Sequence, residues 1–193
     1  MKDNLKIAKT LIEALPYIQK FRGKTIVLKF GGSIGSKEFT NFARDLVLLN
    51  YVGINPVVVH GGGAEITKAL SKAGLEANFI DGLRVTCDKT MDIVEKVLFK
   101  KVNKQIVSKI NSIGGSSIGL SGAQNQLLKV KKIKSAKKGV DLGRVGEIVK
   151  VNVPAIHELQ KKGFIPVIAP IGINSKGITF NINGDYAASK IAS

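Results

Sequence analysis

Residues 57–63 read VVVHGGG, an apolar run that ends in one histidine and three consecutive glycines before a helical pattern begins at Ala64. Apolar residues without alternation are typical of a strand buried on both faces of a parallel sheet. Three glycines leave backbone N–H groups accessible where the next helix starts, and such a helix N-terminus attracts anions. The segment therefore predicts a parallel α/β sheet with an anion-binding edge. We expect His60 to hydrogen-bond this loop, with a general base as the alternative.

The same pattern occurs upstream, where the apolar run Thr25–Phe30 leads into KFGGS at residues 29–33. Ligands bind outside the carboxyl ends of parallel strands, so Lys29 is expected to point into that crevice, where desolvation strengthens its attraction for anionic oxygens. Gly31 and Gly32 are expected to let backbone N–H groups approach a phosphate. The alternative is a surface lysine followed by a tight turn.

Strand and helix patterns alternate along the rest of the chain. Pro16 is expected to kink or interrupt the first helix, and Asp88 to cap the long one. Short mixed runs within 127–151 predict an antiparallel hairpin or flap. The order predicts an α/β fold, a three-layer αβα sandwich with a mainly parallel sheet. The expected helices cover 3–20, 37–51, 64–73, 88–110, 154–162 and 184–193, and the expected strands 25–30, 57–60, 117–120, 164–169 and 178–181.

Two further loops carry polar groups suited to a small acidic ligand. DGLRVT at 81–86 places Arg84 where its guanidinium can fork onto a substrate carboxylate, and an ion pair with Asp81 is the alternative. NINGD at 181–185 offers two amides and a carboxylate, which could hold an amino-acid backbone or order catalytic lysines. The alternative there is helix capping by Asn183 or Asp185.

Composition narrows the class of protein. The 193 residues are 44% hydrophobic and 23% charged, and no run approaches the roughly 20 apolar residues of a membrane helix. A single cysteine, Cys87, and the lack of a metal-ligand cluster argue against a disulfide or metal framework, and we expect a cytoplasmic protein. The net charge of +16 raises nucleic-acid binding as an alternative, although only 6% of residues are aromatic. We expect a solvated face of the flap to carry the lysines that such binding would use, Lys129, Lys131, Lys132, Lys134, Lys137 and Lys138.

Taken in order, the motifs resemble those of the acetylglutamate kinases of the amino acid kinase family. The resemblance covers nearly the whole chain, and DGLRVT is its most discriminating segment. No phosphate loop of the GxxxxGK[ST] type, protein-kinase motif or nucleophile elbow competes with it. The segments that carry the resemblance are KFGGS (29–33), VVVHGGG (57–63), DGLRVT (81–86), GLSG (119–122), DLGRVGEI (141–148), FIPVIAPIG (164–172) and NINGDYAA (181–188).

The resemblance implies transfer of the γ-phosphoryl group of Mg-ATP to the side-chain carboxylate of N-acetyl-L-glutamate, with Mg²⁺ held mainly by the nucleotide phosphates. A carboxylate is already ionised at neutral pH, so catalysis would need positioning and charge stabilisation and no general base. The implied roles are phosphoryl stabilisation by Lys29 with the N–H groups of Gly31 and Gly32, acetylglutamate binding by Gly62, Gly63, Arg84 and Asn181, and orientation of the catalytic lysines by Asp185.

The resemblance also implies a domain organisation. It assigns 1–22 to a kinked helix like that of the arginine-sensitive, hexameric branch, 23–177 to an acetylglutamate-binding domain, and 178–193 to the start of a nucleotide-binding domain. A homo-oligomer is implied, either a dimer or a hexamer assembled through the leading helix. We expect the chain alone to transfer little phosphate, and a truncated, inactive binding or assembly module is the alternative. One departure is Ala123-Gln124-Asn125, where the family has a charged GKDG-like stretch.

Overall fold

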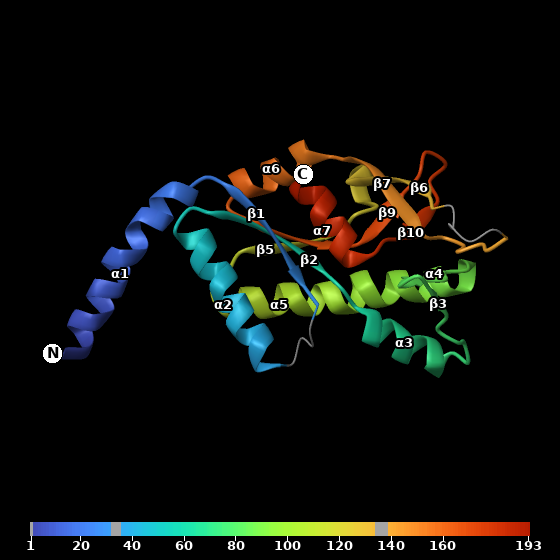
Figure 1. The fold of residues 1–193 in the computed structure, drawn as a ribbon, viewed down its shortest axis with the longest axis horizontal. Helices are drawn as coiled ribbons and strands as arrows, with labels where there is room; N and C mark the ends of the chain where they lie inside the picture. The colour runs from blue at the N-terminus through green and yellow to red at the C-terminus, as the bar shows by residue number, and fades with distance from the viewer. Residues whose placement is uncertain (1, 32–35, 134–138) are drawn as a thin grey trace.

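A four-stranded parallel sheet forms the centre of the computed structural model, which describes residues 2–31, 36–133 and 139–193. Its strand order is β1-β2-β8-β5, so the first two strands of the chain lie side by side (Figure 1). β1 pairs with β2 in parallel register, and Phe30 lies opposite His60 where both strands end. The strands are β1 (Thr25–Phe30), β2 (Asn55–His60), β8 (Ile165–Ala169) and β5 (Ser117–Ser121).

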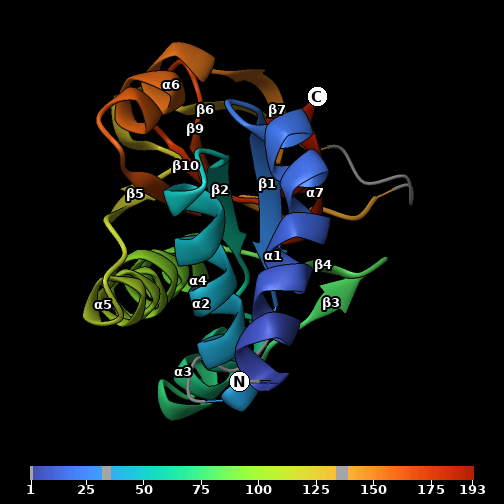
Figure 2. The ribbon, with the colours of Figure 1, turned by 90° about the vertical axis from the view of Figure 1, so that its left-hand side faces the viewer.

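Helices cover both faces of this sheet, as the alternating pattern predicts. α2 (Lys37–Tyr51) and a long continuous helix lie on one face; the long helix comprises α4 (Asp88–Glu95), a π-helical stretch η1 (Lys96–Asn103) and α5 (Lys104–Ser112). α3 (Gly63–Lys72) packs against α4 and η1. The opposite face carries α6 (Val153–Lys161) and α7 (Gly184–Ala192), and Figure 2 shows β1 and β2 between α2 and α7. The predicted α/β fold with a parallel sheet and helices is confirmed.

A second sheet, in the order β10-β9-β6-β7, lies beyond the first. β6 and β7 are antiparallel, which confirms the predicted hairpin. The sequence patterns did not reveal β9 or the two-stranded sheet β3-β4, because these strands have only two or three residues. The strands are β6 (Leu128–Lys132), β7 (Gly146–Val151), β9 (Ile171–Ile173), β10 (Thr179–Asn181), β3 (Phe79–Ile80) and β4 (Leu83–Arg84).

The core consists of two apolar clusters separated by the parallel sheet. Val58 faces the cluster under α2 and the long helix, whereas Val57 and Val59 face the cluster under α6 and α7. All three valines are fully buried, so β2 needs apolar side chains on both faces, as its sequence predicts. The same prediction is wrong for β1: Thr25 and Lys29 are exposed, because β1 lies at the edge of the sheet.

Two predictions about helices also need correction. The expected interruption at Pro16 does not occur, because α1 (Lys2–Phe21) is one continuous helix, while a kink at Pro16 stays a prediction. Cys87, not Asp88, is the N-cap residue of α4. Asp88 lies in the first turn, where its Oδ1 pairs with Arg144 Nε at 2.7 Å. The Ala123-Gln124-Asn125 segment enters a short 3₁₀ helix, η2 (Gln124–Gln126).

α1 projects away from the rest of the molecule (Figure 1). Several large apolar side chains of this helix are solvent-exposed over about half or more of their surface, which is unusual for an isolated monomer. Among the described residues, no helix combines the length and apolarity that a membrane crossing requires. The exposed apolar residues of α1 are Leu5, Ile7, Leu11, Ile12, Leu15 and Tyr17.

Candidate active site

The carboxyl ends of β1 and β2 bring the two predicted glycine motifs together. The Gly61 N–H donates to the Phe30 carbonyl over 2.9 Å, so both loops leave the sheet side by side. Lys29 bends back over its own loop: a Cβ on Gly31 would lie 2.5 Å from Lys29 Nζ. Glycine at position 31 leaves room for this approach, and a Cβ there would displace the end of the flexible lysine side chain. Gly32, predicted to bind phosphate, lies outside the described residues.

α7 adds a carboxylate to this edge. Lys29 Nζ lies 3.0 Å from Asp185 Oδ1, with the two side chains 31% and 73% exposed. Asn183 caps α7, because its Oδ1 accepts from the N–H groups of Asp185 at 2.9 Å and Tyr186 at 3.0 Å. The capping alternative thus holds for Asn183, while the Asp185 side chain contacts the lysine. An exposed pair of this kind contributes little to stability, so its main effect is to orient Lys29.

Arg84 on β4 is 6% exposed and brings a buried positive charge to the same edge. Its Nη2 donates to the Gly63 carbonyl and to Thr67 Oγ1, each over 2.9 Å, and its guanidinium lies 4.5 Å from the Phe79 ring centroid. Its Nη1 is buried and has no hydrogen-bond partner among the residues that the structure describes. Burial lowers the pKa of Arg84, yet an arginine remains charged at neutral pH. A buried cation with an unused donor is costly unless an acceptor binds there.

A cavity of about 250 Å³ is lined by Lys29, Arg84 and Asp185. Asn181 borders it from β10, where the Asn181 Nδ2 group donates to Thr86 Oγ1 over 3.3 Å. The structure therefore brings together every predicted site residue that it describes, although they come from separate parts of the chain. These cavity-lining residues are Lys29, Gly31, Gly62, Gly63, Arg84, Asn181 and Asp185.

His60 is fully buried beneath the glycine loop, as expected of a residue that hydrogen-bonds the loop. Its Nδ1 lies 2.8 Å from the Gly61 carbonyl oxygen, and its Nε2 lies 3.1 Å from Asn103 Nδ2. Burial lowers the pKa of His60 to about 4, so the ring is neutral at physiological pH. Both ring nitrogens are engaged, which argues against a general base. Asn103 belongs to no motif that the sequence analysis identified.

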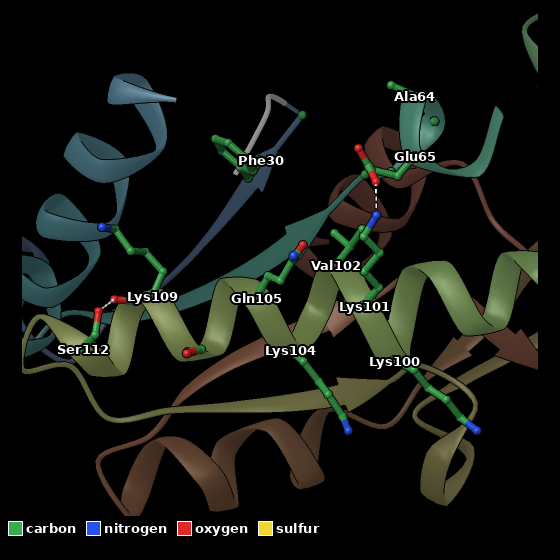
Figure 3. Close-up of a pocket in the computed structure, with 15 residues that line it drawn as sticks. Phe30, Ala64, Glu65, Lys100, Lys101, Val102, Lys104, Gln105, Lys109 and Ser112 are labelled. Atoms are coloured by element: carbon green, nitrogen blue, oxygen red, sulfur yellow. Dashed lines mark hydrogen bonds and ion pairs between the residues drawn. The ribbon is translucent and has the colours of Figure 1, made fainter. Parts of the chain in front are cut away.

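A larger, more open cavity of about 1030 Å³ adjoins the glycine loops along the long helix (Figure 3). Lys100, Lys104 and Lys109 border it, and Lys101 pairs with Glu65 of α3. The ion pair ties the start of α3 to the long helix.

The described lysines of the flap are exposed side chains on β6, whose Leu128 and Val130 are buried, as expected for a solvated face. Lys131 pairs with Glu147 at 3.2 Å and Lys132 with Asp141 at 2.8 Å, so acidic neighbours offset part of their charge. Lys129 is exposed on the same strand. Lys134, Lys137 and Lys138 lie outside the described residues.

The strand ends of this α/β sheet bring together Gly31, the glycines at 61–63, a lysine–aspartate pair and an arginine whose Nη1 has no partner among the described residues, an arrangement suited to binding an anion. The model of the amino acid kinase family matches residues 24–193, and the chain belongs to that family. It is 50% identical over 192 residues to an acetylglutamate kinase of Caldanaerobacter subterraneus subsp. tengcongensis, covering 98% of this chain and 63% of that protein. It is 51% identical to an acetylglutamate kinase of Ruthia magnifica, covering 96% and 65%.

Solved structures agree on the fold. An N-acetylglutamate synthase from Neisseria gonorrhoeae, complexed with coenzyme A and N-acetylglutamate, superimposes with a TM-score of 0.82 at 25% identity, covering 96% of this chain and 42% of that one. A carbamate kinase from Giardia matches with a TM-score of 0.61 at 14% identity, covering 88% and 68%, and supports the fold alone. The chain spans slightly less than two thirds of the length of the curated relatives that it matches.

Proposed function

We propose that this chain forms the acceptor-binding part of an ATP-dependent kinase that converts N-acetyl-L-glutamate to N-acetylglutamyl 5-phosphate in arginine biosynthesis. The observation that carries the proposal is the buried Nη1 of Arg84, which has no partner within the described parts of the chain and lies at the cavity that Lys29 also borders. A ligand with two carboxylates suits two separate cations. Identity of about half to acetylglutamate kinases supports the choice of acceptor.

In this proposal Arg84 holds the carboxylate that does not react. Its Nη2 is already fixed by Gly63 and Thr67, so the guanidinium needs no reorganisation when an acceptor oxygen arrives at Nη1. The N–H groups of Gly62 and Gly63 lie at the start of α3, where the helix dipole favours negative charge, and they contribute further donors. Asn181 contacts the amino-acid end of the substrate from β10.

The proposed reaction is an in-line displacement. An oxygen of the side-chain carboxylate forms a bond to the γ-phosphorus of ATP, the bond to the β–γ bridging oxygen breaks, and ADP leaves with that electron pair. No proton moves, since the attacking group is ionised. Lys29 stabilises the charge on the transferring group, Asp185 keeps its ammonium in place, and Gly31 and Gly32 supply N–H donors. Bound Mg²⁺ would neutralise charge on the nucleotide phosphates.

The proposal extends to organisation and location. Residues 23–177 are proposed to bind acetylglutamate, and 178–193 to begin the nucleotide-binding domain. The exposed apolar residues of α1 are proposed to associate with another copy of the chain, giving a dimer or hexamer, and the protein is proposed to act in the cytoplasm. Neither a nucleic acid nor a membrane is a proposed partner.

Calorimetric titration tests the acceptor. N-acetyl-L-glutamate is expected to bind, whereas N-acetyl-L-glutamine, which lacks the side-chain carboxylate, and L-glutamate, which lacks the acetyl group, are expected to bind at least tenfold more weakly. Equal binding of all three ligands, or none of them, would remove the proposed acceptor. If the native protein binds N-acetyl-L-glutamate but transfers no phosphoryl group to its side-chain carboxylate, the alternative of an inactive binding or assembly module is favoured.

A further inference from the structure

A buried polar chain connects the long helix to the glycine loop of the cavity. It starts at Asn103, the last residue of the π-helical stretch η1, and passes through His60 to the Gly61 carbonyl. Asn103 is 1% exposed and His60 is fully buried. Buried polar groups are normally paired, and here the pairing also affects the tautomer of His60 and the orientation of the loop peptide.

The partners determine the tautomer of His60. A carbonyl oxygen only accepts, so the Nδ1 atom that contacts the Gly61 oxygen must carry the proton. The ring is neutral, and its Nε2 therefore accepts from the Asn103 Nδ2 group. That amide group also donates to the Val167 carbonyl over 2.9 Å, which fixes which end of the Asn103 amide faces the ring. Both partners of His60, the Gly61 carbonyl and the Asn103 amide, therefore favour its Nδ1–H form.

The tautomer in turn orients one peptide unit of the loop. The Gly61 carbonyl and the Gly62 N–H belong to the same planar trans peptide, so they point in opposite directions. Because the carbonyl points toward the buried ring, the Gly62 N–H points away from it, and Gly62 borders the cavity. Among the described residues, the Gly62 N–H donates no hydrogen bond. This N–H group is therefore oriented to donate a hydrogen bond to a ligand in the cavity.

The surroundings leave little freedom for other arrangements. A Cβ on Gly119 of β5 would lie 2.0 Å from Asn103 Oδ1, so the strand leaves room for this amide only by having no side chain there. A Cβ on Gly62 would lie 2.6 Å from Leu98 Cδ2, so the loop itself rests directly on η1. The same helical stretch therefore supports the loop through Leu98 and orients its peptide through Asn103.

We propose that Asn103 is a positioning residue: by holding His60 in the Nδ1–H tautomer, it aims the Gly62 N–H at an oxygen of the bound carboxylate substrate. The inference rests on the proposed function for the identity of that substrate. Asn103 does not touch the cavity, so its effect on binding reaches the ligand only through His60 and the loop. A role limited to joining helix and sheet would leave the tautomer and the ligand affinity unchanged.

The first test needs no substitution. Long-range ¹H–¹⁵N correlation spectra of the imidazole distinguish a protonated from an unprotonated ring nitrogen. At pH 7 the wild-type His60 is expected to show a protonated Nδ1 and an unprotonated Nε2, the less common form in water. A protonated Nε2 with a bare Nδ1 would overturn the proposal, whatever the ligand of the cavity.

The second test compares Asn103→Ala with Asn111→Ala. Asn111 is a matched control: it lies on the same long helix and its side chain hydrogen-bonds Ser117 of β5, but the described contacts do not link it to His60. Both variants are expected to melt at lower temperature. Only Asn103→Ala is expected to shift His60 toward the Nε2–H form, move the Gly62 amide resonance and weaken N-acetylglutamate binding at least tenfold.

The outcomes separate this inference from the proposed function. If wild-type protein does not bind N-acetylglutamate, the proposed function fails, and the tautomer and the Gly62 resonance still decide the role of Asn103. If both variants retain the wild-type tautomer, or weaken binding equally, Asn103 serves only packing and the inference is wrong. Should Asn103→Ala not fold, the wild-type tautomer and the same comparison with Asn103→Ser decide the matter.

Discussion

Replacing Arg84 with lysine changes the donor geometry of the cavity while keeping the charge. In the wild type, Nη2 serves the Gly63 carbonyl and Thr67 Oγ1 at 2.9 Å each, and Nη1 remains for a ligand. One ammonium group cannot occupy both positions of this fork. The variant must give up either the contacts to α3 or the charge-assisted bond to the ligand, and such a bond contributes about 1.5–3 kcal/mol.

We therefore expect Arg84→Lys to weaken N-acetylglutamate binding by about 1–3 kcal/mol, which is roughly a 5- to 150-fold rise in the dissociation constant. Isothermal titration calorimetry measures this directly. Arg144→Lys is the matched control, because that arginine pairs with Asp88 at 2.7 Å and its side chain does not border the cavity. The Arg144→Lys variant is expected to bind N-acetylglutamate as tightly as the wild type does. Unchanged affinity in Arg84→Lys would refute the assignment of Nη1 to the ligand.

Four further predictions follow from the same geometry. Lys29→Ala should lower kcat much more than it raises KM, since its charge acts mainly in the transition state; equal losses would indicate a ground-state role. Asp185→Asn should also lower kcat, yet change the free energy of unfolding by less than about 1 kcal/mol, because the pair is exposed. His60 binds a proton in the unfolded chain below pH 6.5 but in the folded chain only near its pKa of about 4. This difference in proton binding contributes about 3 kcal/mol to the free energy of unfolding, which is present above pH 6.5 and lost as the pH falls toward 4. Denaturant titrations of His60→Gln should lack this part of the pH dependence. Deleting residues 2–21 should reduce the mass measured by light scattering, and an unchanged oligomer would contradict a role for α1 in assembly.

The fold was predictable where apolar patterns are long. α2 was expected at residues 37–51 and lies there, since its stripe of apolar residues repeats at helical spacing over four turns. The burial of β1 was not predictable, because an edge strand and a central strand can share the same apolar sequence. β3 and β4 are too short to show an alternation of apolar and polar residues, although β4 carries Arg84.

The residues that border the site could be predicted from the sequence, but the buried contacts that hold them in place could not. Glycine motifs at strand ends marked the edge of the sheet, and the described glycines of those motifs border one cavity. Asn103 escaped notice because it follows Val102 in an amphipathic helix, where a polar residue beside the apolar stripe usually faces solvent. Its burial was indicated only indirectly, by Gly119 in the facing strand. That Arg84 Nη1 is buried without a partner among the described residues depends on three-dimensional packing and leaves no trace in the sequence.

In the proposed reaction, the side-chain carboxylate of N-acetylglutamate accepts a phosphoryl group at this edge of the sheet. The most direct measurement uses N-acetylglutamate labelled with ¹⁸O in that carboxylate, Mg-ATP and the enzyme purified from its own cells. Hydroxylamine traps the acyl phosphate and releases inorganic phosphate, which is analysed by mass spectrometry. We expect one ¹⁸O atom in each phosphate released with the hydroxamate, and loss of this product in Lys29→Ala. Phosphate without ¹⁸O, together with no hydroxamate, would contradict this mechanism.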